Sequence, residues 1–247
     1  MLFNLWFDMP HRPTKDVDML GYGDHGLDAL AEIFKEVCGI FVDDGIVFNA
    51  ETVNAIEIRK DSNYEGVRVT FTGLIDNVRC PIQIDIGYGD AVTPQADHVE
   101  YPVLLPDMPK PTLCAYPRYT VVAEKTEALI KLAMANTRLK DYFDLWVVSK
   151  HLDFDGPLLQ QAIAATLERR KTEIDRDPVG LSDDFANDRG KRTQWNAFIR
   201  KNKLTAPVLD VVIEQLKQFL IPVLASQAGS QTLDRQWPAG GPWRRHE

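Results

Sequence analysis

The sequence predicts an α+β protein in which a β-sheet comes first along the chain and helices follow. Before residue 90, apolar residues alternate with polar ones in several short runs, which is typical of half-buried strands. From residue 118 onward, apolar residues recur with helical spacing, and a proline-rich segment separates the two regions. Strands followed by helices indicate an α+β core with a helical addition. We therefore expect a core at 1–117, a helical domain at 118–225 and a flexible tail at 226–247.

The first half contains one helix and several strand-like runs. Asp24 is a plausible N-cap for a helix over 24–38, and Gly39 is a typical helix end. The pair Asp76-Asn77 stands between two alternating runs and has the composition of a hairpin turn. The expected strands lie at 16–20, 46–49, 54–60, 67–74 and 78–86.

The second half is helical by the same criterion. Prolines between 102 and 117 exclude a regular helix there and predict a surface connector. Residues after 225 are rich in Gly, Gln, Pro and Arg, so we expect them to be loosely held. The expected helices lie at 118–134, 139–151, 158–169, 193–200 and 208–224.

The composition excludes several classes of protein. With 247 residues, 45% of them hydrophobic and 26% charged, the chain is not collagen-like, coiled-coil or wholly disordered. It has no run of about 18–20 apolar residues and no basic segment before its apolar start, so we expect neither a membrane span nor a signal peptide. Three separated cysteines without a C-x-x-C pair argue against a disulfide framework or a zinc knuckle. These features together predict a cytoplasmic protein.

Charge is distributed unevenly along the chain. Residues 1–110 contain 8 Lys and Arg against 19 Asp and Glu, whereas residues 111–247 contain 20 against 17. An acidic half beside a mildly basic half suits a metal-binding part joined to a part that tolerates polyanions. A chance imbalance of surface charge is the competing explanation.

Three aspartates in the acidic half form a candidate metal site. In a strand, the two-residue period places Asp16 and Asp18 on one face while Val17 points into the core. Asp85 stands between two isoleucines near the end of an otherwise apolar strand. If the two strands are neighbours, three carboxylates converge and require a cation, for which Mg²⁺ or Mn²⁺ suits oxygen ligands best. Two such ions are the usual arrangement for displacement at phosphorus. Turn or capping roles for these aspartates are the alternative.

Several motifs, in order along residues 1–203, carry a family resemblance. Residues 12–20 (RPTKDVDML) fit the pattern R-x-T-x-D-[IV]-D-[LM], and residues 82–90 (IQIDIGYGD) contain Asp85. Residues 123–129 (AEKTEAL), residues 138–146 (RLKDYFDLW) and residues 185–195 provide the later motifs. Together they resemble the AbiEii/AbiGii toxin family, which comprises nucleotidyltransferases of bacterial toxin–antitoxin and abortive infection systems. The resemblance implies a mixed-sheet core like that of DNA polymerase β.

The resemblance also implies a reaction and its site. A nucleoside monophosphate would pass from an NTP to the hydroxyl of a tRNA-like RNA, and a cognate antitoxin would be a partner. Asp16, Asp18 and Asp85 would hold the metals, Asp85 could accept the hydroxyl proton, and Lys125 could reach the triphosphate. Further nucleotide contacts would come from Thr14, Lys15, Arg138, Lys140, Asp141 and Asp144, with Lys140 and Asp144 one turn apart as an ion pair.

One element of the family has no counterpart in this sequence. Members hold the triphosphate with a Gly-Gly or Gly-Ser pair that opens a helix before the aspartates, but the first glycine here is Gly21. The start MLFNLW resembles the interior of that helix, so we expect the glycines just upstream of Met1 or else a natural truncation. A catalytically silent binding protein is therefore a competing function. A metal-dependent nuclease is another, since three carboxylates also suit phosphodiester hydrolysis.

A basic cluster in the second half is a candidate RNA contact. It combines cationic and aromatic residues, which suits an RNA backbone and its bases, although a solvated helix face is the alternative. Its members are Arg189, Lys191, Arg192, Trp195, Phe198, Arg200, Lys201 and Lys203.

Overall fold

The chain forms two compact units. The computed structural model describes residues 2–7, 12–14, 17–23, 26–61, 64–103, 105 and 107–245, without the side chains of 59–61 and 64–65. The sheet unit contains the described residues of 13–90 and 102–110. The helical unit contains those of 2–12, 91–101 and 111–245. The expected boundary at residue 117 does not coincide with these units, because the N-terminal segment and residues 91–101 pack with the helices.

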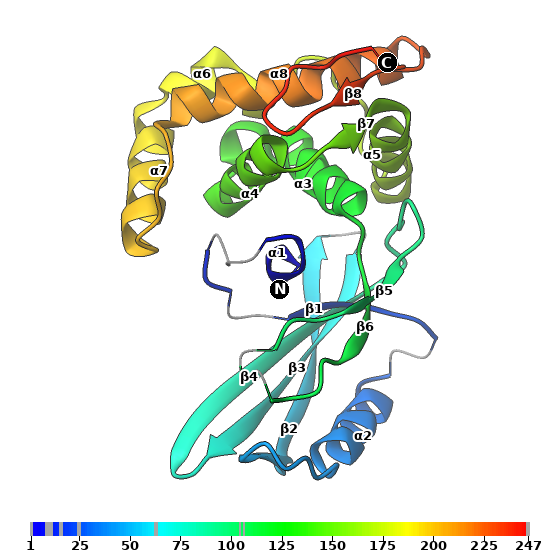
Figure 1. The fold of residues 1–247 in the computed structure, drawn as a ribbon, viewed down its shortest axis with the longest axis vertical. Helices are drawn as coiled ribbons and strands as arrows, with labels where there is room; N and C mark the ends of the chain where they lie inside the picture. Colours follow the sequence, from blue (N-terminus) through cyan, green and yellow to red (C-terminus); the bar gives the residue numbers. More distant parts are fainter. Residues whose placement is uncertain are drawn as a thin grey trace. The chain divides into compact units, whose positions relative to one another are not determined.

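A four-stranded mixed sheet forms the sheet unit (Figure 1). Its strands are ordered β1 (Val17–Gly21), β4 (Val78–Tyr88), β3 (Tyr64–Ile75) and β2 (Ile46–Asp61). β1 runs parallel to β4, whereas β4–β3 and β3–β2 are antiparallel. The mixed sheet and the α+β class are thus confirmed. The two runs expected at 46–49 and 54–60 are one strand, interrupted by a register shift between Asn49 and Asn54.

Helix α2 (Leu27–Cys38) covers one face of this sheet. Its Leu30 is buried with Val67, Val69, Ile84 and Ile86, which all point to the same face because they alternate along β3 and β4. The helix is capped by Gly26, so the expected start at 24 was wrong, and Asp24 itself lies outside the described residues. The polar side chains that alternate with these residues along β3 and β4 therefore lie on the face opposite α2.

The hairpin between β3 and β4 matches the expected turn. Ile75 pairs with Val78, which leaves Asp76-Asn77 as a two-residue loop. Asp76 has a φ of 49°, a left-handed conformation that Asp and Asn tolerate better than most residues. This two-residue turn fixes the register between β3 and β4. It therefore also fixes the position of Asp85, which lies eight residues after Asn77.

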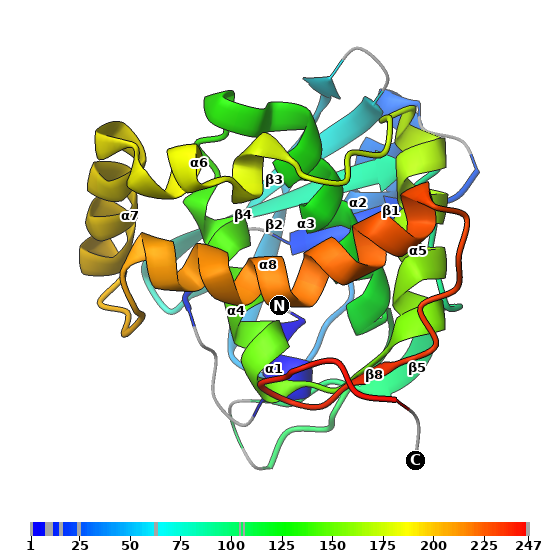
Figure 2. The same cartoon turned by 90° about the horizontal axis from the view of Figure 1, so that it is seen from above.

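Helices dominate the other unit. Figure 2 shows α8 crossing over α4, and α8 also packs on α5. The expected helices are all present within a few residues, whereas α6 and the four shortest strands were not expected. Among the described residues, no helix is both long and apolar enough to span a bilayer. The elements are α1 (Phe3–Trp6), β5 (Asp97–Glu100), β6 (Thr112–Ala115), α3 (Arg118–Leu132), α4 (Leu139–His151), β7 (Phe154–Asp155), α5 (Gly156–Arg170), α6 (Asp183–Asn187), α7 (Arg189–Lys201), α8 (Leu209–Ala228) and β8 (Gln236–Trp237).

The expectation of a flexible tail from residue 226 was wrong. Trp237 is fully buried, and its indole Nε1 donates to the carbonyl oxygen of Ser149 at 2.7 Å. Trp243 stacks on Phe219 and donates to its carbonyl at 2.9 Å. Two tryptophans bury enough apolar area to hold a segment whose overall composition is polar.

Candidate functional site

Two of the predicted metal-binding aspartates lie side by side on the sheet. Asp18 of β1 and Asp85 of β4 are register partners on adjacent parallel strands. Paired residues on neighbouring strands share a face, so both carboxylates lie on the face opposite α2. Asp18 is exposed, whereas Asp85 is only 6% exposed.

The position of Asp85 follows from the pattern of its strand. Ile84 and Ile86 enter the core beneath α2, and the pleat therefore directs Asp85 to the other side. Gly87 and Gly66 pair next to it, where the sheet leaves this face without side chains. A Cβ on Gly66 would lie 3.1 Å from the carbonyl oxygen of Ile86, so a larger residue would crowd this row.

An arginine of the neighbouring strand neutralises Asp85. Arg68 of β3 is the register partner of Asp85 on its other side. Its Nε lies 2.8 Å from Oδ1 and its Nη2 lies 2.9 Å from Oδ2, which is a two-point charge-assisted contact. The amide of Gln83 lies 3.5 Å from Oδ1. A buried carboxylate requires such a partner, because an uncompensated charge at this depth is costly.

The remaining residues of the first motif are only partly described. Asp16 and Lys15 lie outside the described residues, and Thr14 is exposed. Among the described residues, which exclude Asp16, no group of three or more potential ligands forms a metal cluster. The pair Asp18 and Asp85 nevertheless fits a hard divalent ion, since both supply carboxylate oxygens on one face of the sheet.

A second cluster of charges lies in the helical unit. Lys125 of α3 places its Nζ 2.8 Å from Oδ1 of Asp141 and 2.9 Å from Oδ2 of Asp144, both on α4. Arg12 contacts both oxygens of Asp144, at 2.6 and 2.7 Å. Arg138 Nε lies 2.7 Å from Oδ2 of Asp141, an ion pair without hydrogen-bond geometry. We call these five side chains the α3–α4 charge cluster.

Burial and charge shift the pKa values within this cluster. Burial alone would raise the pKa of Asp141, but the charges of Lys125 and Arg138 outweigh it and lower the pKa. Burial alone would lower the pKa of Lys125, but Asp144 and Asp141 outweigh it and raise the pKa. Lys125 and Asp141 are therefore both ionised at neutral pH. The five side chains carry a formal charge of +1 between them.

The i, i+4 pair expected between Lys140 and Asp144 was wrong. Asp144 turns toward Arg12 and Lys125 instead, and its side chain is 2% exposed. Lys140 is exposed and forms no ion pair within the described part of the chain. The structure thus brings together three of the predicted nucleotide contacts, Lys125, Asp141 and Asp144. Arg138 lies at the edge of this group, with 51% of its side chain exposed. Lys140 lies apart from it.

The basic cluster on α7 is divided between surface and core. Lys191 is buried, donates to the carbonyl oxygen of Asn136 at 2.7 Å and lies over the ring of Phe185. Trp195 is also buried and donates to the carbonyl of Pro207 at 3.0 Å. Both are therefore structural residues. Arg189, Arg192, Arg200, Lys201 and Lys203 remain exposed.

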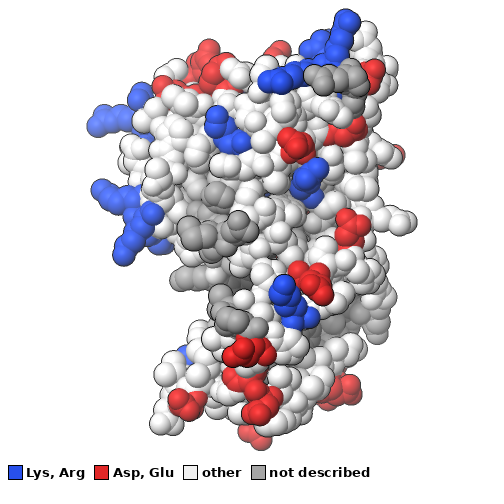
Figure 3. All heavy atoms as spheres, in the orientation of Figure 1, with Lys and Arg blue, Asp and Glu red and all other residues white. Residues whose placement is uncertain are grey.

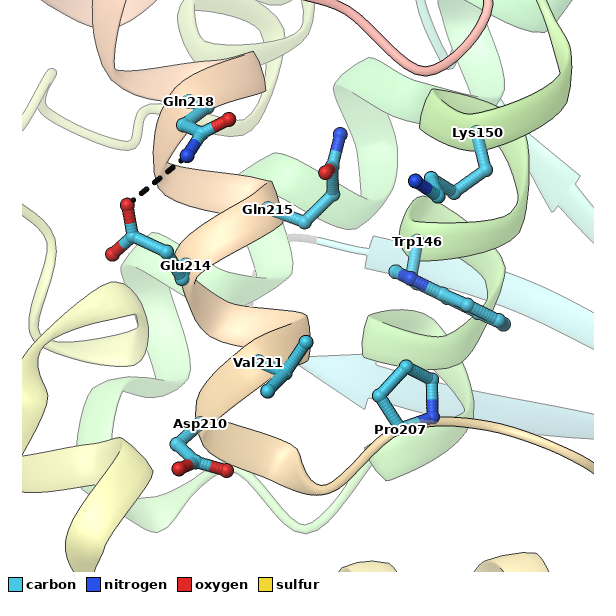
Figure 4. Close-up of a pocket in the computed structure, with 8 residues that line it drawn as sticks. All are labelled: Trp146, Lys150, Pro207, Asp210, Val211, Glu214, Gln215 and Gln218. Carbon is cyan, nitrogen blue, oxygen red and sulfur yellow. Dashed lines mark hydrogen bonds between the residues drawn. The ribbon is translucent and has the colours of Figure 1, made fainter.

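A separate hollow lies between α4 and α8. It has a volume of about 470 Å³, and Figure 4 shows Trp146 and Lys150 of α4 facing Gln215 and Val211 of α8 across it. Among the described residues, Nε2 of Gln215 is one of the buried polar atoms without a hydrogen-bond partner. None of the predicted site residues lines this hollow, so it is not the predicted nucleotide site.

Two arginines belong to these clusters but were not among the predicted site residues. Arg12 carries the first letter of the R-x-T-x-D-V-D pattern, so its place in the motif was the available signal. Arg68 is the polar residue between Val67 and Val69 in the alternating pattern of β3, so it lies on the polar face of that strand. That position was visible in the sequence, but its partner depends on the strand register.

Comparison with known proteins identifies the family of the chain and solved structures with a similar fold. Residues 1–219 match the family model described as "Nucleotidyl transferase AbiEii toxin, Type IV TA system". The fold is similar to that of a candidate nucleotidyltransferase from H. pylori, with a TM-score of 0.51 and 13% identity over 93% of this chain and 85% of that one. Another H. pylori protein, JHP933, gives a TM-score of 0.48 and 14% identity over 92% of this chain and 84% of that one. No curated protein matches in sequence. The family match covers most of the chain, which therefore belongs to the AbiEii family of nucleotidyltransferase toxins from type IV toxin–antitoxin systems.

Proposed function

We propose that this protein is a metal-dependent nucleotidyltransferase that transfers a nucleoside monophosphate from an NTP to a hydroxyl of a tRNA-like RNA and releases pyrophosphate. One observation carries the metal-dependent part: Asp18 and Asp85 are register partners on one face of the sheet, in a chain that belongs to a nucleotidyltransferase family. Two oxygen-donor residues on adjacent strands suit Mg²⁺ or Mn²⁺.

The sheet unit would hold the metal ions and the reacting groups. Asp16, Asp18 and Asp85 are the proposed ligands, with two ions as the usual number for this chemistry. When bound, such ions would neutralise charge at the triphosphate and lower the pKa of the attacking hydroxyl. Asp85, buried on the central strand β4, would position the acceptor and receive its proton.

The α3–α4 charge cluster would hold the triphosphate. Its five side chains have an excess of one positive charge, and half of the Arg138 side chain is exposed to meet an anion. Asp141 and Asp144 hold Lys125 in a single orientation with both carboxylates within 2.9 Å of its Nζ. A cation fixed in this way loses little side-chain entropy when it binds phosphate. Thr14 and Lys15 are proposed as further nucleotide contacts from the first motif.

Helix α7 would contact the RNA backbone. The helix has no acidic residue between 189 and 201. Arg189 and Arg200 are about three helical turns apart and fall on the side away from the buried Lys191 and Trp195, and the exposed Arg192 lies beside them. Lys and Arg gather over α7 in Figure 3. Such a stripe suits phosphate contacts and recognition of RNA shape more than of base sequence.

The biological setting follows from the proposed reaction. A cognate antitoxin is the expected counterpart of a toxin in a type IV system. NTPs and tRNA are cytoplasmic molecules, so we place the reaction in the cytoplasm.

The test is a label-transfer assay with total tRNA, Mg²⁺ and each α-labelled NTP in turn. We expect label on RNA with the unaltered protein and its loss by at least 100-fold in Asp18→Asn and Asp85→Asn, since each removes a proposed metal ligand. Asp76→Asn is the matched control, because it removes one negative charge from an exposed turn of the same sheet. RNA shortening without NTP would instead indicate a nuclease, and equal transfer by Asp85→Asn would refute the proposed site.

A further inference from the structure

The contact between Arg68 and Asp85 has a consequence for metal binding. The guanidinium fork engages both oxygens of Asp85, at 2.8 and 2.9 Å. On one face, the strands β1, β4 and β3 therefore present Asp18, Asp85 and Arg68 in a row. A divalent ion held by Asp18 and Asp85 would approach the central carboxylate from the side opposite Arg68.

The two cations would compete for the same carboxylate. An Arg–carboxylate fork places two parallel N–H donors on the two oxygens, which withdraws electron density from the groups that would donate to a metal. The Arg68 side chain is 35% exposed, so it has solvent on one side into which the guanidinium can turn. Asp85 is 7% exposed at its side chain, so it needs a positive partner at all times.

We propose that Arg68 is a positioning residue that takes the place of the metal charge at Asp85 and must loosen its two-point contact before a divalent ion binds. This inference rests on the proposed metal site. It implies that Arg68 keeps the sheet unit stable without metal and lowers the affinity of the site for free ions. The occupancy of this site by metal ions would then depend on the ions that an NTP brings with its phosphates.

The test measures Mn²⁺ binding to the full chain without nucleotide, from the loss of the free-ion EPR signal on titration. We expect Arg68→Gln to bind Mn²⁺ about tenfold more tightly than the unaltered protein, which corresponds to about 1.4 kcal/mol. Arg68→Lys, which retains the charge but not the fork, should shift the Kd in the same direction by less. Thermal unfolding followed by circular dichroism checks that each variant is folded, and Arg68→Lys carries the test if Arg68→Gln is not.

Two controls isolate the contact. Arg79→Gln removes the same charge from an exposed position of β4, about 20 Å along the strand, and should leave the Mn²⁺ affinity within twofold. In an Asp85→Asn background, Arg68→Gln should no longer change the affinity, because the carboxylate for which the cations compete is gone.

The outcomes separate the two proposals. Mn²⁺ binding that Asp18→Asn abolishes but that Arg68→Gln leaves unchanged or weakens would overturn the role of Arg68 and leave the metal site standing. An absence of saturable binding in every variant, Arg68→Gln included, would overturn both. Tighter binding in Arg79→Gln of the same size as in Arg68→Gln would reduce the effect to general charge and also overturn the inference.

Discussion

The α3–α4 charge cluster predicts that removal of one carboxylate destabilises the helical unit more than removal of the lysine it holds. Asp141→Asn would raise the formal charge of the cluster from +1 to +2 and leave Asp144 as the one carboxylate among its five side chains. Asp141 is fully buried, so the loss of a partner there falls in the range of about 3–5 kcal/mol. Lys125→Met would instead lower the formal charge to zero.

The lysine variant should be milder because two matched pairs remain. Arg12 would keep Asp144, and Arg138 would keep Asp141, at the contacts of 2.6–2.7 Å that exist already. The expected cost is about 1–3 kcal/mol, mainly from the hydrogen bond that Oδ1 of Asp141 loses. Urea unfolding followed by tryptophan fluorescence measures both, because all five tryptophans belong to the helical unit and report its transition.

The order of the two variants in their free energy of unfolding is the outcome that tests this prediction. If Lys125→Met lowers the free energy of unfolding as much as Asp141→Asn or more, charge balance does not govern the stability of this cluster. Lys131→Met, which removes a charge from an exposed position of the same helix, is the control and should cost less than about 0.5 kcal/mol.

Three further predictions concern pH, the C-terminal segment and RNA. Because the pKa of Asp141 is lowered, the stability of the helical unit should fall as pH drops below about 4, and because the pKa of Lys125 is raised, it should also fall as pH rises above about 10.4. The urea midpoint measured against pH should show a smaller loss on the acid side in Asp141→Asn than in the unaltered protein. Trp237→Ala should cost about 3–5 kcal/mol by urea unfolding, and a cost below about 1 kcal/mol would contradict its burial. Replacement of Arg189, Arg192 and Arg200 by Gln should weaken tRNA binding and flatten its salt dependence in fluorescence anisotropy, whereas an unchanged salt slope would exclude α7 as the contact.

The sheet was largely predictable because its signals are local. Alternation along β3 and β4 and the two-residue turn at Asp76-Asn77 specify a hairpin without reference to the rest of the chain. The sequence predicts two strands where the structure has β2, because the register shift between Asn49 and Asn54 separates two strand-like runs. In the structure, Thr52 Oγ1 accepts from the amide of Thr72 and carries the pairing across the irregularity.

The packed C-terminal segment was missed because composition averages hide single large residues. Residues 226–247 have few apolar side chains, yet Leu233, Trp237 and Trp243 are all buried. Gly156 permits the approach of this segment, since a Cβ there would lie 2.3 Å from the carbonyl oxygen of Leu233. A close contact between segments so distant in sequence leaves no local pattern to read.

The candidate site was predictable in its carboxylates but not in their partners. The two-residue period places Asp18 and Asp85 on the polar face of their strands from the sequence alone. Their pairing with each other and with Arg68 depends on which strands are neighbours, which is a property of the whole sheet. The partner of Lys191 was equally unpredictable. A lysine in a basic helix is expected to be exposed, and nothing in the sequence indicates that its Nζ is buried against Asn136.

The metal site itself is the central claim, and anomalous diffraction from crystals grown with Mn²⁺ and a non-hydrolysable NTP tests it most directly. The account predicts a manganese peak between Asp18 and Asp85, coordinated by both carboxylates, with the contact from Arg68 to Asp85 loosened. Manganese bound elsewhere on the protein, with Asp85 still held at both oxygens by Arg68, would contradict it.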